Sequence, residues 1–431
     1  MENITIFWFR RDLRLEDNTG LYYACQNEKN VLPLFIFDQD ILEDLEDKKD
    51  ARVHFIHQQI SRLHQELQEL GATILVKLGK PMDIFKELVK VYSIQAVYTN
   101  RDYEPYAIQR DQEVEKYLQN KEIPFLEFKD QVLFEKNEIT TGEGSFYKVY
   151  TPYRKAWMKK FNQANIPSYK ANFNHLWKKK PFPLPSLKDI GFKESDIHFP
   201  PLEIDKSSIK KYDQLRDFPE LDATSHLGIH LRFGTISVRK LAQEAQNLNE
   251  TFLGELIWRE FFMMILYHNP KVVNHAFKSQ YDRIPWRNDL EEFQKWCDGK
   301  TGFPIVDAGM RELNQTGNMH NRVRMITASF LTKHLLIDWR WGEAYFAKKL
   351  LDYELASNNG NWQWVAGTGT DAQPYFRIFN PESQTQKFDK DNKYIKKWVK
   401  EWGTDQYPPP MVNHKMARER ALKTYKSALK Q

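Results

Sequence analysis

The stretch Leu351–Trp364, LDYELASNNGNWQW, gathers acids, amides, a glycine and two tryptophans directly after an apolar, aromatic-rich segment. Buried polar groups must be hydrogen-bonded, so this clustering indicates a polar ligand bound inside a helical fold. Asn358 suits a ligand atom that gains and loses a proton, because an amide donates or accepts without adding charge. Trp362 and Trp364, two positions apart, should point to different sides of a helix. Packing alone is the alternative explanation for either ring.

A second cluster lies in ELIWREFF, residues 255–262. Glu255, Trp258 and Phe262 fall at helical spacing, so a carboxylate and a large flat ring share one face while Arg259 points aside. Such a stripe is more often core, but a charged group among core residues needs a partner. Both a packing and a binding interpretation therefore remain open.

The sequence MHNRVRM, residues 319–325, forms a third candidate site. Asn321 and Met325 share a helix face at i and i+4, and Arg322 and Arg324 point elsewhere. Arg324 could pair with Asp352, and a structural salt bridge on a solvated helix is the alternative.

A fourth candidate joins YDQLR, residues 212–216, to DATSHLG, residues 222–228. Thr224 and Ser225 stand where a helix could begin, and hydroxyls plus free N–H groups at a helix start, near Arg216, would make a diphosphate cradle. An ordinary N-cap is the more common use of such residues.

Composition sets the broad class. With 41% hydrophobic and 28% charged residues, the chain is typical of globular proteins with room for two or three domains. The net charge of +5 is compatible with a polyanionic partner. No signal peptide or membrane-length apolar run is present, so we expect a cytoplasmic protein with no membrane partner. Cys25 and Cys297 are far apart, which predicts free thiols and no metal site.

The first part of the chain predicts a doubly wound α/β domain over residues 1–130. We expect strands at Ile4–Phe9, Val31–Phe37, Ala72–Val76, Ala96–Thr99 and Phe125–Phe128, and helices at Val53–Leu70 and Met82–Tyr92. The first strand runs into RRDLRLEDN rather than a glycine-rich turn, which argues against a nicotinamide-type site. A ligand of this domain should lie at the carboxyl ends of the strands, near Phe37–Ile41 and Asn100–Tyr106.

The second part predicts an all-helical domain over residues 211–431, separated from the first by a linker at 131–210. Six prolines lie within residues 162–211. Nine of the twelve tryptophans lie after residue 250. Helical patterns cover Ser237–Asn247, Phe252–His268, Val306–Leu313, Val323–Ile337, Gly342–Tyr353 and Tyr394–Trp402. The basic tail after Pro408 should be loosely held.

Taken together, these motifs resemble the photolyase/cryptochrome flavoprotein family, and within it the class I cyclobutane pyrimidine dimer photolyases. The resemblance runs from WFRRDLRLEDN through ELIWREF, GKTGFPIVDAGMRELNQTGNMHNRVRMITASFL and NNGNWQW to TGTDAQPYFRIFNP. It implies an α/β antenna domain, a helical domain that binds FAD, and light-driven repair of pyrimidine dimers in double-stranded DNA by a monomer whose active FAD is reduced and anionic.

The resemblance also implies roles for individual residues. The FAD phosphates would be held by Tyr212, Arg216, Thr224, Ser225, Leu227 and Gly228, and the isoalloxazine by Arg324, Asp352, Glu354 and Asn358, with Asn358 at N5. The cofactor set is completed by His226, Phe252, Glu255, Arg259, Asn321 and Tyr353. The flipped dimer would be received by Glu255, Trp258, Asn321, Met325 and Trp364, with Arg259 and Arg322 on the DNA. Trp362, Trp339 and Trp286 would form the tryptophan relay that reduces the flavin in light.

These roles fit the residue types. The cofactor does the chemistry while the protein supplies position and electrostatics. Glu255 would hydrogen-bond or protonate the dimer's carbonyl side, and Trp258 and Trp364 would stack on its flat faces. Arg322 would hold backbone phosphates. The catalytic residues that the resemblance implies are Glu255, Asn358, Trp362, Trp339 and Trp286.

Four positions depart from the family pattern, and the antenna pocket follows one variant of it. His226 replaces an arginine, Gly228 a serine, Phe252 a tryptophan, and Glu354 lengthens the second acid of a usual Asp-x-Asp.

For the antenna, Tyr106 and Ala107 replace the Asn-Glu pair of folate-binding relatives. The residues that match a deazaflavin-type pocket are Arg52, Asp102, Glu104 and Arg232. A deazaflavin or FMN antenna is therefore favoured over a folate, and an empty pocket is the alternative.

A blue-light receptor of the cryptochrome type is the competing function. Such a receptor would have no need to retain the five residues of the lesion pocket together. A photolyase for the six-four photoproduct is disfavoured because that group has a histidine at the position of Asn321, and a DASH cryptochrome because tyrosine usually stands at Trp364.

Overall fold

The computed structural model describes residues 1–430, which form two compact units. The first unit comprises Met1–Glu135, Lys159–Glu203 and Leu227–Glu244, and the second comprises Lys136–Met158, Ile204–His226 and the chain from Ala245 onward. Each unit is therefore assembled from three separate segments of the sequence, and each is described by itself.

The first unit contains a five-stranded sheet in the order β3-β2-β1-β4-β5. All four strand pairings are parallel. Its strands are β1 (Glu2–Phe9), β2 (Val31–Asp38), β3 (Leu75–Gly79), β4 (Tyr92–Asn100) and β5 (Phe125–Phe128). Its helices are α1 (Thr19–Asn27), α2 (Gln39–Glu43), α3 (Ala51–Glu69), α4 (Pro81–Val91), α5 (Pro105–Gln119), η1 (Phe173–His175) and α9 (Gly228–Arg232). The strand order reverses between β1 and β4, so this is the doubly wound fold that the sequence predicts.

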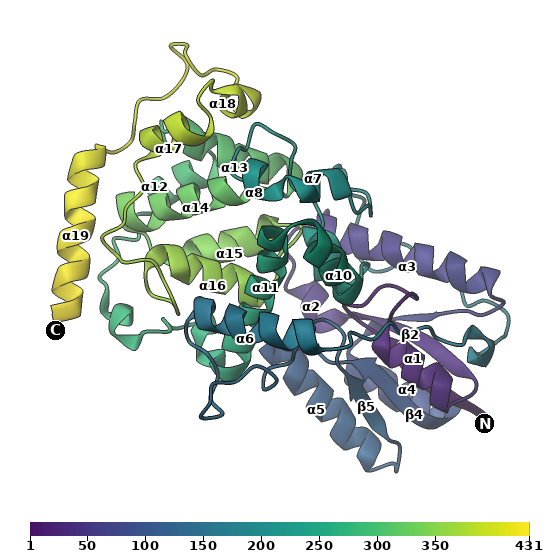
Figure 1. Ribbon diagram of the computed structural model, residues 1–431. Coiled ribbons are helices and arrows are strands. Elements are labelled where there is room, and N and C mark those ends of the chain that lie inside the picture. The colour runs from purple at the N-terminus through teal and green to yellow at the C-terminus, as the bar shows by residue number, and fades with distance from the viewer. Residues whose placement is uncertain (431) are drawn as a thin grey trace. The chain divides into compact units, whose positions relative to one another are not determined.

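Helices cover the sheet because its central strands are apolar on both faces. Every residue of β2 is buried. Trp8 of β1 packs with Phe85 of α4 and Val114 of α5 in one core cluster. Helix α1 packs against β1, β4 and β5, as Figure 1 illustrates.

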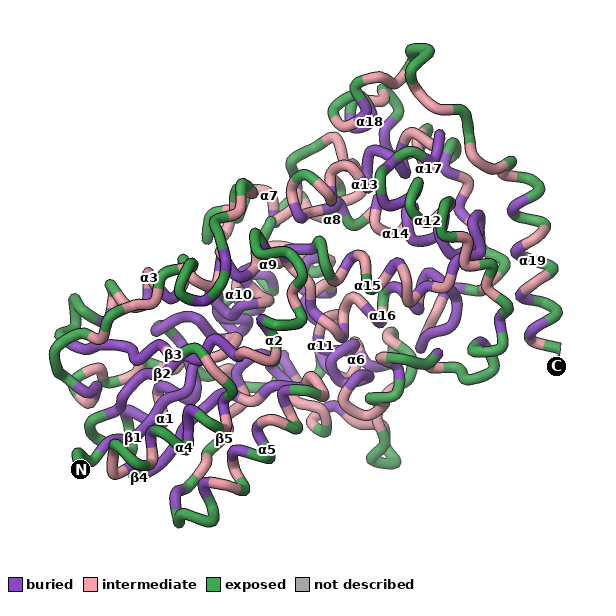
Figure 2. Tube along the Cα trace, turned by 180° about the vertical axis from the view of Figure 1, so that it is seen from behind, coloured by how far each residue is buried: buried purple, intermediate pink, exposed green. Residues whose placement is uncertain are grey.

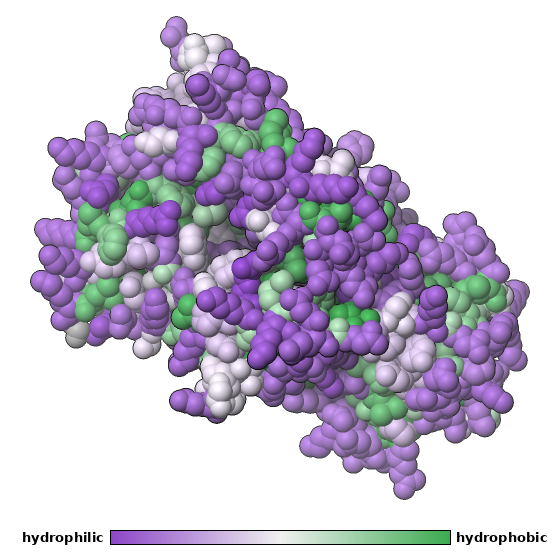
Figure 3. Space-filling model, in the orientation of Figure 1, coloured by the Kyte–Doolittle hydropathy of each residue, from purple (hydrophilic) through white to green (hydrophobic). Residues whose placement is uncertain are grey.

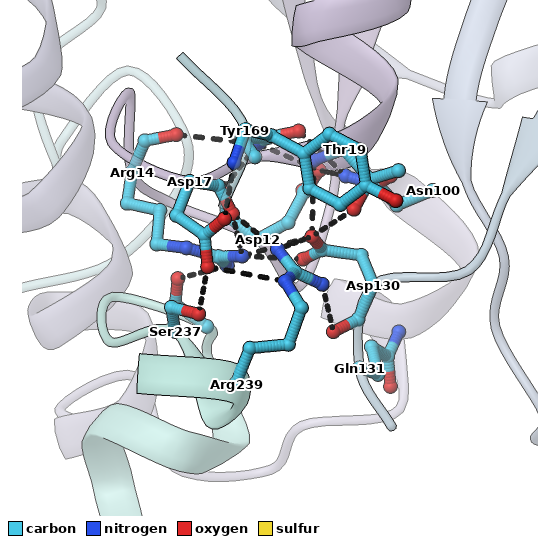
Figure 4. A network of polar contacts seen from close by, with 12 residues as sticks. Asp12, Arg14, Asp17, Thr19, Asn100, Asp130, Gln131, Tyr169, Ser237 and Arg239 are labelled. Carbon is cyan, nitrogen blue, oxygen red and sulfur yellow. Dashed lines mark hydrogen bonds and ion pairs between the residues drawn. The ribbon is translucent and has the colours of Figure 1, made fainter. Parts of the chain in front are cut away.

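A buried polar network closes the first unit across long sequence separations (Figure 4). Asp17 accepts from Arg239 Nε at 3.1 Å and from the backbone N–H of Tyr169 at 2.8 Å. Asp130 accepts from Arg14 at 2.8 and 2.9 Å and from Arg239 at 2.9 Å. Burial opposes ionisation of Asp130, but Arg14 and Arg239 lower its pKa to about 2. The RRDLRLEDN motif therefore serves to join the two ends of this unit.

The second unit is helical. Its elements are α7 (Lys206–Lys210), α8 (Tyr212–Leu215), α11 (Glu250–His268), η2 (Pro270–Val273), η3 (Ser279–Arg283), α12 (Leu290–Cys297), α13 (Pro304–Thr316), α14 (Asn321–Ser329), the π-helical turn η4 (Phe330–His334), α15 (Trp339–Lys349), α16 (Leu355–Ala366), α17 (Pro381–Phe388), α18 (Lys393–Trp398) and α19 (His414–Lys430). Two further helices, α6 (Tyr150–Gln163) and α10 (Val238–Leu248), each contribute residues to both units. Helix α16 packs against α11, α14 and α15, so it is central to this unit (Figure 2).

Several expected elements differ from the structure. The strand expected at Ala72–Val76 is β3 at Leu75–Gly79, because Ala72 and Ile74 are buried without pairing and the ladder to β2 starts at Leu75. The predicted linker contains the helix α6, whose Tyr153, Trp157 and Phe161 recur at helical spacing and are buried.

The expectation of a loosely held tail is wrong. Residues 414–430 form α19, which buries Ala417, Ala421, Tyr425 and Ala428 on one face. The overall basic composition of the tail concealed this stripe. Cys25 and Cys297 are free thiols, as predicted, and both are buried. No helix within residues 1–430 is long and apolar enough to cross a membrane.

Candidate functional site

The stretch Leu351–Trp364 is built around helix α16. Its N-cap is Glu354, whose carboxylate accepts from the backbone N–H groups of Ala356 at 3.1 Å and Ser357 at 2.8 Å. A carboxylate at this position satisfies free donors and complements the helix dipole. Gly360 brings α16 close to α11, because a Cβ there would lie 2.2 Å from the Phe262 ring. The lengthened acid therefore fixes the start of the helix that carries Asn358.

Asn358 is oriented by a residue that sequence reasoning missed. Its Nδ2 donates to Glu343 Oε1 at 2.8 Å and to the backbone oxygen of Glu343 at 3.1 Å. Burial raises the pKa of Glu343, while the bond from Asn358 opposes this rise. Because the amide nitrogen is held by Glu343, the amide oxygen of Asn358 is the atom left to face a ligand. An acid within WRWGEAYF, among aromatic neighbours, is the signal that could have indicated it.

The pair predicted between Arg324 and Asp352 is confirmed, with 3.0 Å between Nη2 and Oδ2. Arg324 Nε also donates to the Met319 backbone oxygen at 2.7 Å, which fixes the guanidinium. The second carboxylate oxygen, Asp352 Oδ1, is buried without a hydrogen-bond partner. A buried acceptor of this kind is costly unless a ligand donor satisfies it.

Two residues with different predicted roles meet at the end of α8. Arg216 Nη1 donates to Glu255 Oε1, and its guanidinium lies 5.4 Å from the centre of the Tyr212 ring. Phe252 packs edge-on against the same ring at 5.2 Å. Burial raises the pKa of Glu255, and Arg216 acts in the opposite direction.

The indole of Trp258 has a stacking partner that sequence reasoning also missed. The Tyr150 ring lies parallel to it, with 3.5 Å between ring centres and 8° between planes. Tyr150 is held by its hydroxyl, which donates to the Gly254 oxygen at 2.8 Å, and by its N–H, which donates to Asp371 at 3.0 Å. The nearby Thr370 hydroxyl donates to the Lys148 oxygen at 2.6 Å. A flat-ring stack is therefore already formed at this position.

Helix α14 presents the predicted DNA-side residues. Asn321 is exposed at its start, and Arg322 Nη1 lies 3.8 Å from the sulfur of Met325. Arg322 also pairs with Asp217 at 2.7 Å and lies over the Phe388 ring at 4.4 Å. Figure 3 shows the surface hollowed near the middle of its view, over the region where Figure 1 labels α14 and α15.

The tryptophans divide by burial. Trp362 and Trp339 are 3% and 1% exposed in one core cluster, and Trp286 and Trp364 are partly buried against that cluster. Gly342 allows α15 to approach Trp362, because a Cβ there would lie 2.1 Å from the indole. Trp296, which sequence reasoning did not select, is fully buried with its ring centre 6.2 Å from that of Trp362. The relay residues thus share a continuous apolar core.

The segment predicted to hold phosphates is not a helix start at Thr224. Residues Thr224, Ser225 and His226 are irregular, and α9 begins only at Gly228 with Leu227 as its N-cap. His226 adopts a positive φ of 50° and pairs with Asp222. Because of this turn at His226, α9 starts at Gly228 and not at Thr224. Of the remaining predicted residues, Arg259 follows Trp258 on α11, and Tyr353 packs against the core cluster.

In the first unit, three of the four predicted antenna residues lie together. Glu104 accepts from Arg11 at 2.7 Å and from Arg232 at 2.9 Å, and Asp102 accepts from Arg11 at 3.2 Å. Burial opposes ionisation of Asp102, but Arg11 and neighbouring arginines hold its pKa below its usual value. Arg52 instead pairs with Asp50, the N-cap of its own helix.

The sequence matches two family models. The family described as "DNA photolyase" matches residues 5–171, and "FAD binding domain of DNA photolyase" matches residues 252–404. The chain is 37% identical to the deoxyribodipyrimidine photo-lyase of Escherichia coli K12 over 99% of both chains. It is 35% identical to that of Halobacterium salinarum over 98% of this chain and 99% of the relative.

Solved structures agree with this relationship. A bacterial class III photolyase from Agrobacterium tumefaciens matches with a TM-score of 0.89 and 32% identity, covering 100% of this chain and 98% of that chain. An archaeal photolyase from Sulfolobus tokodaii, described with two FAD molecules and a novel light-harvesting cofactor, matches with a TM-score of 0.85 and 34% identity over 99% of this chain and 100% of that one. A cryptochrome from Synechocystis matches with a TM-score of 0.87 and 25% identity over 98% and 99%.

Proposed function

Because this chain belongs to the photolyase/cryptochrome family, we propose that it is a light-driven DNA repair enzyme that returns cyclobutane pyrimidine dimers to monomers. The observation that carries the proposal is full-length similarity to proteins named deoxyribodipyrimidine photo-lyase. The helical unit contains the FAD-binding domain of that family. We propose further that the protein acts as a monomer, in the cytoplasm, on double-stranded DNA.

The residues present fit FAD. Asp352 Oδ1 is a buried acceptor without a partner, and Asn358 presents an amide oxygen because Glu343 holds its nitrogen. An acceptor next to the Arg324 guanidinium suits a ring system that carries both N–H donors and carbonyl oxygens. Tyr212, Arg216, Thr224 and Ser225 would hold the diphosphate. When bound in its reduced form, FAD supplies the excited electron that opens the cyclobutane ring.

The lesion pocket would use Glu255, Trp258, Asn321, Met325 and Trp364. Burial raises the pKa of Glu255, which favours a protonated carboxyl that can donate to a dimer carbonyl. The Tyr150 ring fixes the plane of Trp258, so the indole is already oriented for stacking with an extruded base. Arg216, bonded to Glu255, holds that carboxyl in one position.

The tryptophan relay and the antenna have separate support. Trp362 and Trp339 are buried in one cluster that Trp286 contacts, which supports electron transfer through this core.

For the antenna we propose a deazaflavin or a flavin such as FMN rather than folate. The Sulfolobus relative, whose structure is described with two FAD molecules, supports a flavin-type chromophore. The cluster of Arg11, Asp102, Glu104 and Arg232 would bind its polar groups.

The test is repair of thymine dimers in DNA by the purified, chemically reduced protein under blue or near-ultraviolet light. We expect monomers to be restored in light and not in the dark. Glu255→Ala should reduce repair by about 100-fold, within the range for a positioned proton donor. A protein that binds FAD and is photoreduced, yet leaves dimers intact, would instead be a blue-light receptor of the cryptochrome type.

A further inference from the structure

The two flat faces of the Trp258 indole are both covered by aromatic rings. Tyr150 lies parallel to the indole, with 3.5 Å between ring centres and 8° between planes, and Phe262 lies near-parallel to it at 5.4 Å and 27°. The Tyr150 hydroxyl donates to the oxygen of Gly254, which precedes Trp258 by one helical turn. Phe262 follows the tryptophan by one turn, so the two rings flank the indole from opposite sides. An extruded base that stacks on Trp258 must therefore displace one of them.

Phe262 is fixed by its surroundings. The residue is 3% exposed, and its ring packs directly on Gly360 of α16, where a Cβ would lie 2.2 Å from the ring. Helix α16 also carries Asn358, which is proposed to face the flavin. A base that took the place of Phe262 would therefore have to shift the helix that positions the cofactor. This leaves Tyr150 as the ring that can move.

The backbone that carries Tyr150 is held in place. The Tyr150 N–H donates to Asp371 at 3.0 Å, and the Thr370 hydroxyl donates to the Lys148 oxygen at 2.6 Å. Asp371 has a positive φ of 44°, a conformation that persists in a non-glycine residue only where the surrounding structure holds it. Movement of the Tyr150 ring therefore has to come from rotation of its side chain and not from a shift of the loop.

The Tyr150 side chain can rotate at low cost. It is half-buried, and the preceding residue, Val149, is 45% exposed. Within residues 1–430 its one hydrogen bond is the bond from its hydroxyl to the Gly254 oxygen. Rotation would replace this bond by one to water, and the incoming base would replace the tyrosine ring in the stack, so each lost contact is exchanged for a similar one. Burial raises the pKa of this hydroxyl and Glu255 acts in the same direction, which agrees with a position beside the carboxyl proposed to meet the dimer.

We propose that Tyr150 gates the lesion pocket: its ring occupies the stacking position on Trp258 until an extruded pyrimidine displaces it. The proposal rests on the proposed function, because the incoming base belongs to the dimer that the pocket would receive. The tyrosine competes only with a base that has left the duplex. It therefore lowers the affinity for damaged DNA, whereas the backbone contacts that bind undamaged DNA are unaffected.

The first test compares DNA binding by the FAD-loaded wild-type protein and its Tyr150→Ala variant in the dark. Fluorescence anisotropy is measured with two duplexes that differ only by one thymine dimer. We expect Tyr150→Ala to lower the Kd for the dimer duplex by about 3- to 10-fold, the contribution of one aromatic pair, and to leave the Kd for the undamaged duplex unchanged. Tyr267→Ala is the matched control, because it removes another half-buried tyrosine of the same unit, and it should change neither Kd.

The direction of the change in affinity decides between two roles. If Tyr150 only supported the indole, Tyr150→Ala would weaken binding of the dimer duplex or leave it unchanged, and either result would overturn the proposal. A parallel change in the Kd for both duplexes would also overturn it, because a gate acts only on the extruded base.

A second measurement keeps the ring in place and so does not depend on the stability of the alanine variant. Fluorotyrosine is introduced at position 150, and its fluorine nuclear magnetic resonance is recorded with and without each duplex. A fluorine stacked on the indole is shifted upfield by the ring current of Trp258. We expect the dimer duplex, and not the undamaged one, to move the resonance toward that of free fluorotyrosine. A resonance that stays upfield at saturating dimer duplex would overturn the proposal.

Dimer repair separates this inference from the proposed function. Repair of dimers in light by a protein whose Tyr150 resonance does not move would defeat the gate alone. A resonance that the dimer duplex moves, without repair in light, would defeat the proposed function alone. Equal affinity of the wild-type protein for the damaged and the undamaged duplex would defeat both.

Discussion

At the scale of single residues, Glu255 is subject to two opposing influences. Burial raises its pKa, while the Arg216 guanidinium lowers it, and burial is the larger of the two. An acid whose folded pKa is raised contributes stability that is complete below its unfolded value, here 4.5, and is lost as pH rises through the folded value. The proton on Glu255 therefore stabilises the fold at low pH and is also the one that could reach a dimer carbonyl.

We expect dimer repair by the chemically reduced protein to decline as pH rises through the raised pKa of Glu255. The ionised carboxylate has no hydrogen to donate, whereas Glu255→Gln keeps a donor at every pH. The repair rate of Glu255→Gln should therefore be nearly independent of pH, and its free energy of unfolding should exceed that of the wild type most at high pH. Repair rates and urea unfolding over a pH series measure both effects. Glu250→Gln, an exposed acid at the start of the same helix, is the control, and equal pH profiles for Glu255→Gln and wild type would contradict the role.

At the scale of elements, apolar periodicity identified most helices and strands but not their partners. The runs at Ile4–Phe9 and Val31–Phe37 predicted β1 and β2 closely, because buried parallel strands are apolar throughout. The strand predicted at Ala72–Val76 lies a few residues before the observed β3, because burial begins at Ala72 whereas pairing with β2 begins only at Leu75. Helix α19 was missed because three of its four buried positions are alanines, which carry little hydrophobic signal among seven lysines, arginines and acids.

Helix α19 should therefore tolerate charge on one face and not on the other. We expect Ala421→Asp to lower the free energy of unfolding by about 3 kcal/mol or more, because it would bury an unpaired carboxylate. Ser427→Asp, on the exposed side of the same helix, should change it by less than about 0.5 kcal/mol. Urea denaturation followed by circular dichroism measures both. Equal, small effects would mean that α19 is not held against the core that contains Trp286 and Tyr281.

The sequence predicted the residues of the candidate site that would contact a ligand themselves. It did not predict the residues that hold those side chains in position. Asn358, Glu255 and the Arg324–Asp352 pair stand out by type and spacing. Glu343 acts by orienting Asn358 from the preceding helix, 15 residues earlier, and Tyr150 acts by stacking on Trp258 from a distant part of the sequence. Such contacts depend on which helices pack together, which local patterns do not specify.

At the scale of the whole molecule, the first unit is completed by a segment far along the chain. Gly234 has a φ of 62°, and a Cβ there would lie 2.1 Å from the Arg11 oxygen, so this turn sits directly on the RRDLRLEDN segment. Leu13 N–H donates to the Phe233 oxygen at 3.0 Å. Arg239 then bonds both Asp17 and Asp130. Without residue 239, Asp17 therefore loses its arginine partner and Asp130 keeps only Arg14 of its two arginine partners.

The predicted boundary at residue 210 can be tested on this basis. We expect a fragment of residues 1–248 to unfold cooperatively and a fragment of residues 1–210 to lack a cooperative transition, because the shorter one leaves Asp17 without its arginine. Within 1–248, Arg239→Leu should lower the free energy of unfolding by about 3–5 kcal/mol, the cost of removing one partner from a buried ion pair. The exposed Lys240→Leu is the matched control, since the pairing of Lys240 with Glu16 lies at the surface.

The stability of the wild-type fragment should also depend on pH. The pKa of Asp130 is lowered to about 2, so its stabilising contribution is present above its unfolded value of 3.8 and is lost as pH falls through about 2. Thermal unfolding of the four proteins at neutral and acid pH measures these effects. Equal cooperativity in the two fragments would show that residues 1–210 fold without the later segment.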